Sequence, residues 1–214
     1  MSKKKPFFIV FEGVEGCGKS YQSKKLFNKL KRHKIKTILT REPGGTKSSE
    51  LIRNLILKDY FNKNTKDKFD KYTDTLLYLA ARNEHVINKI KPALLKKQVV
   101  ICDRFTDSTL AYQVYGKQVD MEFINNIHKK ILGKIKPNLV FILKVSAKSS
   151  KLRLKKRKSK NRYDNFAQSF YTKAQQSFLK IAKNKKNYFV FDSSSNDAVL
   201  EKKIFNIVKK YLNI

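Results

Sequence analysis

Residues 13–20 read Gly-Val-Glu-Gly-Cys-Gly-Lys-Ser and match the phosphate-binding pattern G-x-x-x-x-G-K-[ST] in full. They follow the apolar run Phe7–Phe11 and precede a stretch with helical spacing, the order of elements that this chemistry requires. The glycines allow backbone N–H groups to turn inward around a phosphate. Lys19 can reach the β- and γ-phosphates of a nucleotide, and the Ser20 hydroxyl can bind Mg²⁺. A chance match in a glycine turn does not account for this order, so we predict that the chain binds a nucleoside triphosphate.

The elements that must position this loop alternate between strands and helices. Apolar runs of strand length occur at Phe7–Phe11, Thr37–Leu39, Val99–Cys102, Leu139–Val145 and Tyr188–Phe191. Stretches with helical spacing lie between them, and the segment Lys91–Gln98, which contains Pro92, is expected to form a separate short helix. This alternation predicts an α/β fold, in which helices cover both faces of a parallel sheet.

Charged residues follow the first three predicted strands. Glu12 ends the first, Arg-Glu-Pro-Gly-Gly (41–45) follows the second, and Asp-Arg-Phe (103–105) follows the third. Ligands of such sheets bind beyond the carboxyl ends of the strands, so this rim suits a site for two phosphorylated substrates. Taken singly, the same positions have structural explanations: a helix cap at Asp107 or Ser108, a solvated charge at Arg53, and a turn at 43–45. Their joint placement favours the site.

Length and composition restrict the classes of protein that fit. The 214 residues suffice for one well-buried core, so we expect a single domain over residues 1–214. A hydrophobic share of 41% argues against disorder. No apolar run approaches the ~20 residues of a membrane helix, and the basic N-terminus lacks the pattern of a signal peptide. We therefore expect a cytoplasmic protein with no membrane partner, whose Cys17 and Cys102 are reduced.

The formal net charge of +32 reflects 49 Lys and Arg residues against 17 Asp and Glu residues. A field of this strength favours anionic partners, nucleic acid included. The lysines are spread along the whole chain rather than gathered in one stripe, which is typical of a compositional bias on solvated faces. We expect no specific nucleic-acid partner, and only weak binding that falls as salt rises.

Five motifs together carry a family resemblance. They are Glu-Gly-Val-Glu-Gly-Cys-Gly-Lys-Ser (12–20), Arg-Glu-Pro-Gly-Gly-Thr (41–46), Ala-Ala-Arg (80–82), Asp-Arg-Phe (103–105) and Ser-Thr-Leu-Ala-Tyr-Gln (108–113). In this order the chain resembles the bacterial type of thymidylate kinase, a family of phosphate-loop nucleoside monophosphate kinases. The resemblance implies that ATP phosphorylates dTMP to dTDP with Mg²⁺, in dTTP biosynthesis and within a homodimer. It also implies a three-layer fold with a five-stranded parallel sheet and a lid at about 153–164.

The resemblance assigns roles around the triphosphate. The implied ATP-binding residues are Gly13, Val14, Glu15, Gly16, Cys17, Gly18, Lys19, Ser20 and Arg153. The implied catalytic residues are Glu15, Lys19, Arg104, Arg157 and Arg162. Ser20 and Asp103 are the implied Mg²⁺ ligands, because strand-end aspartates hold the metal in other phosphate-loop enzymes.

The implied dTMP-binding residues are Glu42, Arg53, Tyr78, Arg82, Arg104, Ser108, Thr109, Tyr112 and Gln113. Arg53 and Arg104 match arginines that hold the dTMP phosphate, a task suited to bidentate contacts. Tyr78 matches the aromatic residue that stacks on thymine, and it lies four residues before Arg82, on the same helix face. Core packing is an alternative role for Tyr78, since aromatic residues at helical spacing usually serve it.

The part of the lid at residues 157–164, called the lid run below, keeps the arginine spacing of the family. It differs from the family pattern because it is otherwise almost entirely basic. In addition, Gly16 follows the acidic Glu15 of the phosphate loop, where some thymidylate kinases carry an arginine. The loop cannot supply a guanidinium, so the resemblance implies that a lid arginine does so. The candidates are Arg153, Arg157 and Arg162, of which the last two are favoured. Alternatively, this run acts only as a diffuse positive field.

Other functions are compatible with a phosphate loop. The nearest is a different nucleotide or nucleoside kinase on the same scaffold. An ATPase acting on nucleic acid would use the +32 charge directly, but it needs a water-positioning residue and coupling motifs that the sequence lacks. An inactive nucleotide-binding scaffold conflicts with the intact set of Lys19, Ser20, Asp103 and Arg104.

Overall fold

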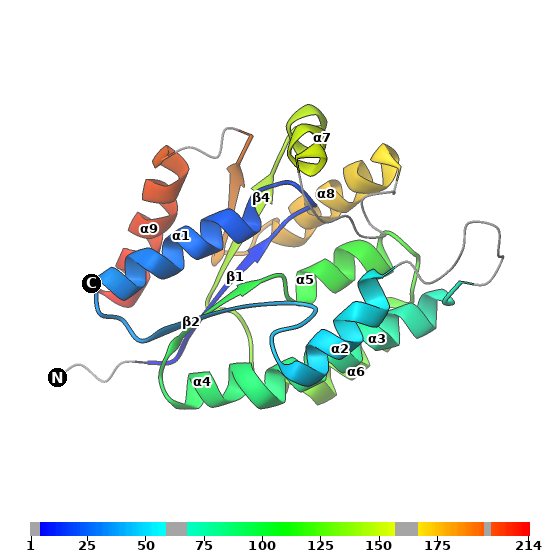
Figure 1. Ribbon diagram of the computed structural model, residues 1–214, viewed down its shortest axis with the longest axis horizontal. Coiled ribbons are helices and arrows are strands. Elements are labelled where there is room, and N and C mark those ends of the chain that lie inside the picture. Colours follow the sequence, from blue (N-terminus) through cyan, green and yellow to red (C-terminus); the bar gives the residue numbers. More distant parts are fainter. Residues whose placement is uncertain (1–4, 59–67, 157–166, 195–197) are drawn as a thin grey trace.

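The computed structural model describes residues 5–58, 68–156, 167–194 and 198–214, which fold around a five-stranded parallel sheet (Figure 1). The strands are β1 (Phe7–Glu12), β2 (Thr37–Arg41), β3 (Val99–Asp103), β4 (Leu139–Lys144) and β5 (Tyr188–Asp192). They lie in the order β2-β3-β1-β4-β5, and every pairing is parallel. The predicted α/β fold with a parallel sheet is therefore confirmed.

Helices cover both faces of this sheet. They are α1 (Lys19–Arg32), α2 (Lys47–Leu57), α3 (Lys71–His85), α4 (Lys91–Leu95), α5 (Thr106–Thr109), α6 (Met121–Leu132), α7 (Ala147–Lys155), α8 (Gln168–Ala182) and α9 (Ala198–Leu212). Two π-helical turns, η1 (Val86–Ile90) and η2 (Leu110–Val114), continue α3 and α5. Figure 1 shows α1 and α9 on one side of the sheet and the α3–α4 region on the other, which gives three layers. Within the described ranges, no helix is long and apolar enough to cross a membrane.

Four strands run further than their apolar patterns indicated. The apolar runs stop at Phe11, Leu39, Cys102 and Phe191. The strands themselves end at Glu12, Arg41, Asp103 and Asp192. Ladder bonds join main-chain groups whatever the side chain is, so a polar residue can end a strand in register with its neighbour. The sheet therefore delivers charged side chains directly to its carboxyl rim.

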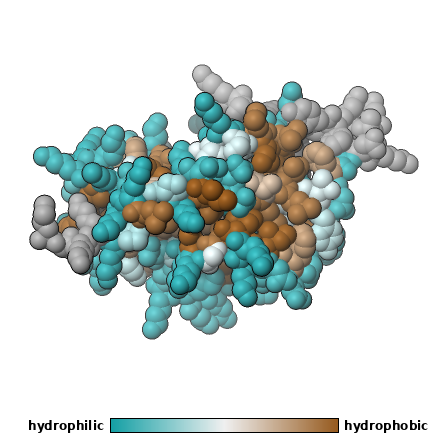
Figure 2. All heavy atoms as spheres, turned by 90° about the horizontal axis from the view of Figure 1, so that it is seen from below, coloured by the Kyte–Doolittle hydropathy of each residue, from teal (hydrophilic) through white to brown (hydrophobic). Residues whose placement is uncertain are grey.

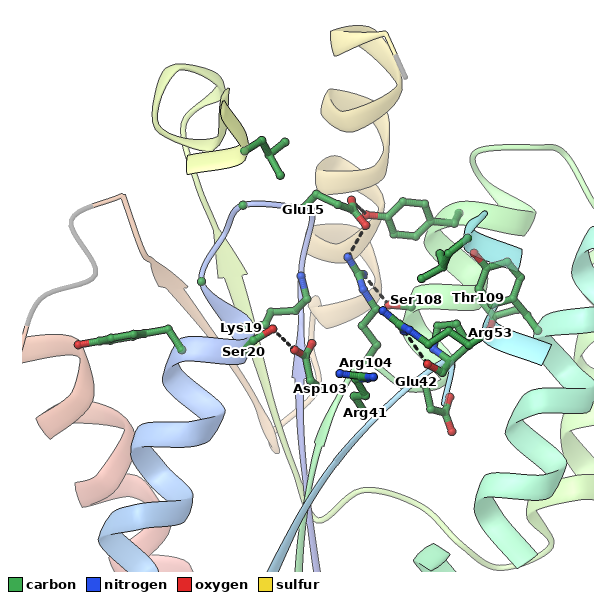
Figure 3. A pocket seen from close by; sticks show the side chains of 18 of the residues that line it. Glu15, Lys19, Ser20, Arg41, Glu42, Arg53, Asp103, Arg104, Ser108 and Thr109 are labelled. Carbon is green, nitrogen blue, oxygen red and sulfur yellow. Dashed lines mark hydrogen bonds and ion pairs between the residues drawn. The ribbon is translucent and has the colours of Figure 1, made fainter. Parts of the chain in front are cut away.

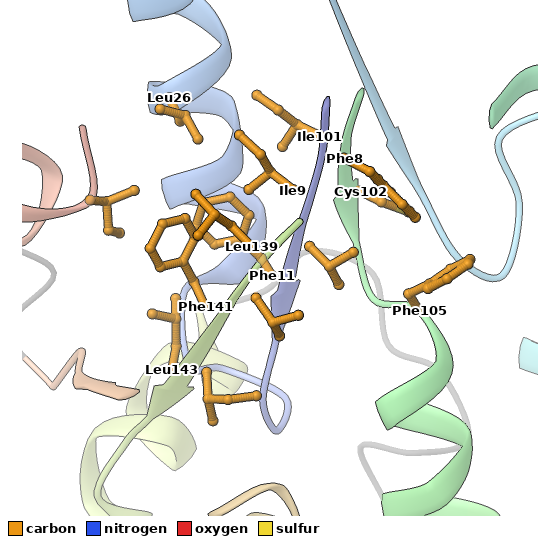
Figure 4. Close-up of a cluster of buried hydrophobic side chains, with 14 of the residues drawn as sticks. Phe8, Ile9, Phe11, Leu26, Ile101, Cys102, Phe105, Leu139, Phe141 and Leu143 are labelled. Carbon is orange, nitrogen blue, oxygen red and sulfur yellow. The ribbon is translucent and has the colours of Figure 1, made fainter. Parts of the chain in front are cut away.

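The core lies between the sheet and its helices (Figure 4). The central strand β1 is buried along its whole length, whereas the edge strands β2 and β5 are mostly half-buried. The rings of Phe11 and Phe141 pack across β1 and β4, with centroids 5.2 Å apart. Phe8 meets Phe105 edge-on at 4.9 Å. Burial on both faces explains the continuous apolar sequence of β1, and it anchors the loop that follows this strand.

The short helix predicted at Lys91–Gln98 is present as α4, but it is not separate. It continues from α3 through η1 without a break, and the Lys91 N–H bonds the Val86 carbonyl five residues back. Proline in a helix interior removes a hydrogen bond and crowds the carbonyl four residues back. The wider π-helical turn ends at Ile90, two residues before Pro92. The predicted break was wrong because the helix accommodates the proline by widening.

Candidate functional site

The phosphate loop joins β1 to α1, and its three glycines hold positive φ angles that other residues rarely adopt. Gly18 precedes α1 with a φ of 90°, a left-handed conformation that glycine adopts without strain. Gly13 has a φ of 138°, and a Cβ there would lie 2.3 Å from the Leu143 carbonyl oxygen of β4. Gly18, Lys19 and Ser20 line a cavity, so the amino end of α1 faces it. Unpaired N–H groups and the helix dipole make this end an anion site.

Lys19 is almost buried at the base of the loop. Its Nζ donates to the carbonyl oxygens of Gly13 at 2.9 Å and Val14 at 2.8 Å. A phosphate oxygen is a charged acceptor and makes stronger hydrogen bonds than a carbonyl does. The ammonium group therefore lies ready to exchange these carbonyls for a phosphate.

Ser20 and Asp103 meet where α1 begins and β3 ends. The Ser20 hydroxyl donates to the Asp103 carboxylate. Oxygen ligands of this kind suit Mg²⁺, which usually takes one or two protein ligands and completes its shell with water and substrate phosphates. In the described segments, no cluster of three or more His, Cys, Asp or Glu side chains could hold a metal ion by itself. The Ser20–Asp103 pair thus fits a magnesium ion that is held mainly by phosphates.

Arg104 stands at the centre of the cavity wall (Figure 3). Its φ is 73°, which is uncommon for a residue with a side chain and occurs mostly where surrounding contacts enforce it. Its guanidinium pairs with Glu15 at 2.6 Å and donates to Ser108 Oγ and the Gly13 carbonyl at 3.0 Å each. Burial would lower the pKa of Arg104, but Glu15 and the further negative groups around it together outweigh burial and raise that pKa well above its ordinary value. Arg104 is therefore a permanent cation.

Glu15 and Tyr112 complete this group. Burial would raise the pKa of Glu15, but the charges of Arg104 and then Lys19 outweigh it and lower that pKa. Its second carboxylate oxygen accepts a hydrogen bond from the Tyr112 hydroxyl. Tyr112 is nearly buried, and the Arg104 guanidinium lies 5.2 Å from the centre of its ring. Glu15 of the phosphate loop is thereby linked to Arg104 and Tyr112, two of the predicted dTMP-binding residues.

Glu12 is a buried carboxylate that the sequence placed only at a strand end. It accepts hydrogen bonds from the backbone N–H of Phe105 at 2.7 Å and from the Ser108 hydroxyl at 2.6 Å. Burial and the nearby Asp107 charge raise the pKa of Glu12. No side-chain cap bond is found at α5, where Phe105 is the capping residue. Ser108 is therefore not a helix cap, and Glu12 docks the start of α5 onto β1.

Arg53 is not a solvated charge, since its side chain is only 19% exposed. It donates to the Pro43 carbonyl at 2.6 Å and lies 3.9 Å from Glu50. Burial and then the neighbouring Arg41 charge lower the pKa of Arg53. Glu50 also bonds the Gly45 N–H at 2.9 Å, which ties the 43–45 turn to α2. Arg41 also pairs with Glu50, at 3.1 Å, so two arginines share one carboxylate and a net positive charge is left for an anion.

Arg82 is held by buried partners on the opposite wall. It donates to Glu42 at 2.7 Å and to the Thr109 hydroxyl at 2.7 Å. His85 contacts the other Glu42 oxygen at 3.1 Å and Thr40 Oγ1 at 2.7 Å. Burial would raise the pKa of Glu42, but Arg82 and His85 outweigh it and lower that pKa. Glu42 therefore serves as an ionised anchor for Arg82.

These groups surround one cavity of about 490 Å³, a size typical of small-molecule sites. All nine predicted dTMP-binding residues line it, as do both predicted Mg²⁺ ligands. The predicted ATP-binding residues that line it are Glu15, Gly16, Gly18, Lys19, Ser20 and Arg153. Gly13, Val14 and Cys17 do not. The Val14 and Cys17 side chains are buried in the core, so only backbone atoms of these two residues can reach a phosphate.

The side chain of Gln113 indicates which chemical group of a ligand this cavity recognises. Its side-chain Nε2 is buried and has no hydrogen-bond partner among the described residues. A buried donor without an acceptor costs free energy, which a ligand carbonyl can recover. Tyr78 lines the same cavity and also packs partly against the core. The geometry therefore leaves both roles of Tyr78 open.

Arg153 reaches from α7 across the phosphate loop. It donates to the Gly16 carbonyl at 3.1 Å and to the carbonyls of Ser193 and Ser194 at 2.7 and 2.6 Å. It thereby joins the loop to the segment after β5. Arg157 and Arg162, the other two lid candidates, lie outside the described residues.

Six further residues line the cavity that were not named as site residues, although Arg41 and Pro43 belong to the 41–46 motif and Leu154 and Lys156 to the implied lid. They are Tyr21, Arg41, Pro43, Leu57, Leu154 and Lys156. Arg41 carried a usable signal, because it directly precedes Glu42 at a strand end. Leu57 had none, since its spacing is that of an ordinary core position.

Comparison with known proteins identifies relatives over almost the whole chain. The family model for thymidylate kinase matches residues 11–204. A thymidylate kinase from Wolbachia sp. subsp. Brugia malayi is 43% identical over 180 residues, which covers 83% of this chain and 82% of that protein. One from Aster yellows witches'-broom phytoplasma is 40% identical over 209 residues, 96% of each chain. The crystal structure of thymidylate kinase from Ehrlichia chaffeensis superposes with a TM-score of 0.73 at 29% identity, and covers 95% of this chain and 99% of that one.

Proposed function

The chain belongs to the thymidylate kinase family, and we propose that its cavity binds ATP and dTMP through the residues described above. The function is the transfer of the γ-phosphoryl group of ATP to dTMP, which yields dTDP and ADP. One observation carries the residue assignment: a single cavity joins the phosphate loop, the half-buried Arg53 and Arg104, and an amide donor that has no partner among the described residues. Their chemistry matches a triphosphate, a monophosphate and a nucleobase in turn.

In this proposal, catalysis rests on alignment and charge neutralisation. Lys19 and the N–H groups of the loop hold the β- and γ-phosphates of ATP. Arg53 and Arg104 hold the phosphate of dTMP in line for attack, and Glu15 keeps Arg104 oriented. No general base is needed, because the attacking phosphate oxygen is already ionised.

We assign Mg²⁺ to the Ser20–Asp103 pair, whose oxygen atoms suit it. The bound ion would neutralise charge on the ATP phosphates during transfer. Ser20 and Asp103 come from different elements, so both α1 and β3 must be in place before this site exists. We also propose that the enzyme works in the cytoplasm.

The test of this function is an ADP-release assay over a panel of nucleoside monophosphates. We expect dTMP to be preferred, dUMP to be weaker and purine monophosphates to be poor. A missing methyl group costs only ~1–3 kcal/mol in an apolar pocket, so dUMP should be disfavoured rather than excluded. A preference for any other monophosphate would favour a different nucleotide kinase.

Tyr78→Ala separates the two roles that the cavity leaves open for Tyr78. Stacking on a base is worth ~1–3 kcal/mol, so we expect the KM for dTMP to rise roughly 5- to 150-fold while the KM for ATP stays constant. Steady-state kinetics with each substrate varied would measure both constants. An equal loss for both nucleotides would instead identify Tyr78 as a packing residue.

We propose that the chain forms one domain whose lid, at about 153–164, supplies the guanidinium that the phosphate loop lacks. An arginine in this role is worth ~10³–10⁵ in rate, so Arg157→Ala or Arg162→Ala should lower kcat strongly. Lys158→Ala lies between them in sequence and is the matched control. Uniform small losses across all three variants, measured by single-turnover kinetics, would mean that the run acts only as a diffuse field.

We propose, further, that the enzyme is a homodimer that associates through α2 and α3. Leu51 and Leu55 lie one turn apart on α2 and are 70% and 44% exposed. Leu76 on α3 and Ile87 on η1 are 48% and 51% exposed. Figure 2 shows apolar side chains gathered on the face of the molecule seen from below. Exposed apolar patches of this kind mark association surfaces.

Leu76→Glu should convert the dimer to a monomer, because a carboxylate would be buried without a partner in the interface. Sedimentation velocity measures the mass directly. Val199→Glu is the matched control, since Val199 is 57% exposed but lies on α9, across the sheet. A wild-type protein that sediments as a monomer would refute the proposed homodimer.

A further inference from the structure

His128 of α6 is buried against Arg82, a contact that no sequence pattern indicated. Its Nε2 lies 2.7 Å from Nη1 of Arg82. A guanidinium can only donate, so Nε2 is the acceptor and the ring proton is on Nδ1. Burial and then the Arg82 charge lower the pKa of His128 to about 3. At neutral pH the ring is therefore an uncharged hydrogen-bond acceptor.

Four of the five N–H groups of Arg82 have protein acceptors. Nε donates to Glu42, and Nη2 donates to the Phe105 carbonyl at 2.8 Å. Nη1 donates to Thr109 and to His128. Within the described part of the chain, one Nη2 hydrogen is left, and Arg82 lines the cavity. A planar group held at four points cannot rotate, so its fifth N–H has a set direction.

We propose that His128 is a positioning residue for recognition of the nucleobase. By accepting from Nη1, it fixes the plane of the guanidinium so that the remaining N–H meets a carbonyl oxygen of the base. This inference rests on the proposed function, because the base must occupy that part of the cavity. A base that carries an amino group in place of this carbonyl presents a donor to a donor, and the site rejects it.

Without His128, Arg82 would be held differently, and this would change the selectivity of the site between bases. Glu42, Thr109 and Phe105 would still hold the guanidinium on three sides. One Nη1 hydrogen would then be buried without an acceptor, and the guanidinium would tilt about its three remaining contacts to recover one. The N–H directed at the base would move with it, so affinity for a 4-oxo base would fall while a 4-amino base would lose little.

The experiment compares His128→Leu with His128→Gln in the full-length enzyme. Leucine removes the acceptor, and we expect the KM for dTMP to rise about tenfold, with kcat within about threefold and the KM for ATP unchanged. The kcat/KM ratio of dTMP over 5-methyl-dCMP, which carries a 4-amino group, should fall about tenfold as well. The side-chain oxygen of glutamine can reach the Nε2 position, so His128→Gln should restore most of both values.

His33→Leu is the matched control, because His33 lies exposed at the end of α1, hydrogen-bonds the Lys29 carbonyl and packs its ring against Phe205 of α9, and does not line the cavity. An unchanged KM and selectivity in His128→Leu would overturn the inference, as would an equal rise in both KM values that glutamine does not repair. If the leucine variant fails to fold, His128→Asn serves instead, since its amide falls short of the Nε2 position. A wild-type enzyme that does not phosphorylate dTMP would refute the proposed function itself, which is a separate outcome.

Discussion

Lys19→Ala should lower kcat by about 10²–10³ while the fold persists, because a preorganised donor to the transferring phosphates is lost. The structure adds a second effect. Lys19 Nζ also bonds the carbonyls of Gly13 and Val14, so its removal frees the loop that must hold the phosphates. The KM for ATP should therefore rise together with the fall in kcat. Stopped-flow phosphoryl transfer and a thermal melt would measure activity and fold separately.

The matched control is Lys24→Ala, an exposed lysine on the same helix α1. Lys24→Ala lowers the net charge by the same amount as Lys19→Ala. It should keep its activity if the position of the lysine, rather than the total charge of the protein, determines the rate. Turnover in Lys19→Ala near that of the wild type would refute the phosphate-loop assignment. In that case, only the family relationship would still argue against the alternative function of an ATPase that acts on nucleic acid.

Arg104→Lys should be nearly as damaging, although it keeps the positive charge. Arg104 donates to Glu15, Ser108 and the Gly13 carbonyl at once, and an ammonium group cannot reproduce this fork. We expect kcat/KM for dTMP to fall by about 10²–10³, chiefly through loss of the aligned acceptor phosphate. Initial rates with dTMP varied at saturating ATP would measure this.

Arg104→Lys should also perturb the phosphate loop, because Glu15 loses its closest cation. Direct binding of ATP by calorimetry separates the two effects, since dTMP is absent. Arg32→Lys, at the exposed end of α1, controls for the substitution itself. If Arg104→Lys binds dTMP as the wild type does, Arg104 is a structural link between β3 and the loop and not a phosphate ligand.

The sequence by itself determined the features that depend on neighbouring residues. Eight consecutive residues specify the phosphate loop, because its chemistry needs only local backbone freedom and two side chains. The apolar run Phe7–Phe11 indicated a strand, and the structure has it as β1 at the centre of the sheet, buried along its whole length. Five motifs in order then indicated the family, which the comparisons establish. The charge of +32 determined nothing about the fold, since net charge bears on solubility and association rather than on architecture.

Only the tertiary structure decided which of the charged residues meet. Arg82 finds its partners 23 to 46 residues away, on segments that follow β2, follow β3 and lie in α5 and α6. Glu12 reaches Ser108 across 96 residues because β1 and β3 are adjacent in the sheet. Periodicity reports which face of an element is apolar, but it does not report which strands are neighbours. Strand order β2-β3-β1 brings these side chains to one rim, and that order arises from packing between distant segments, which no local pattern records.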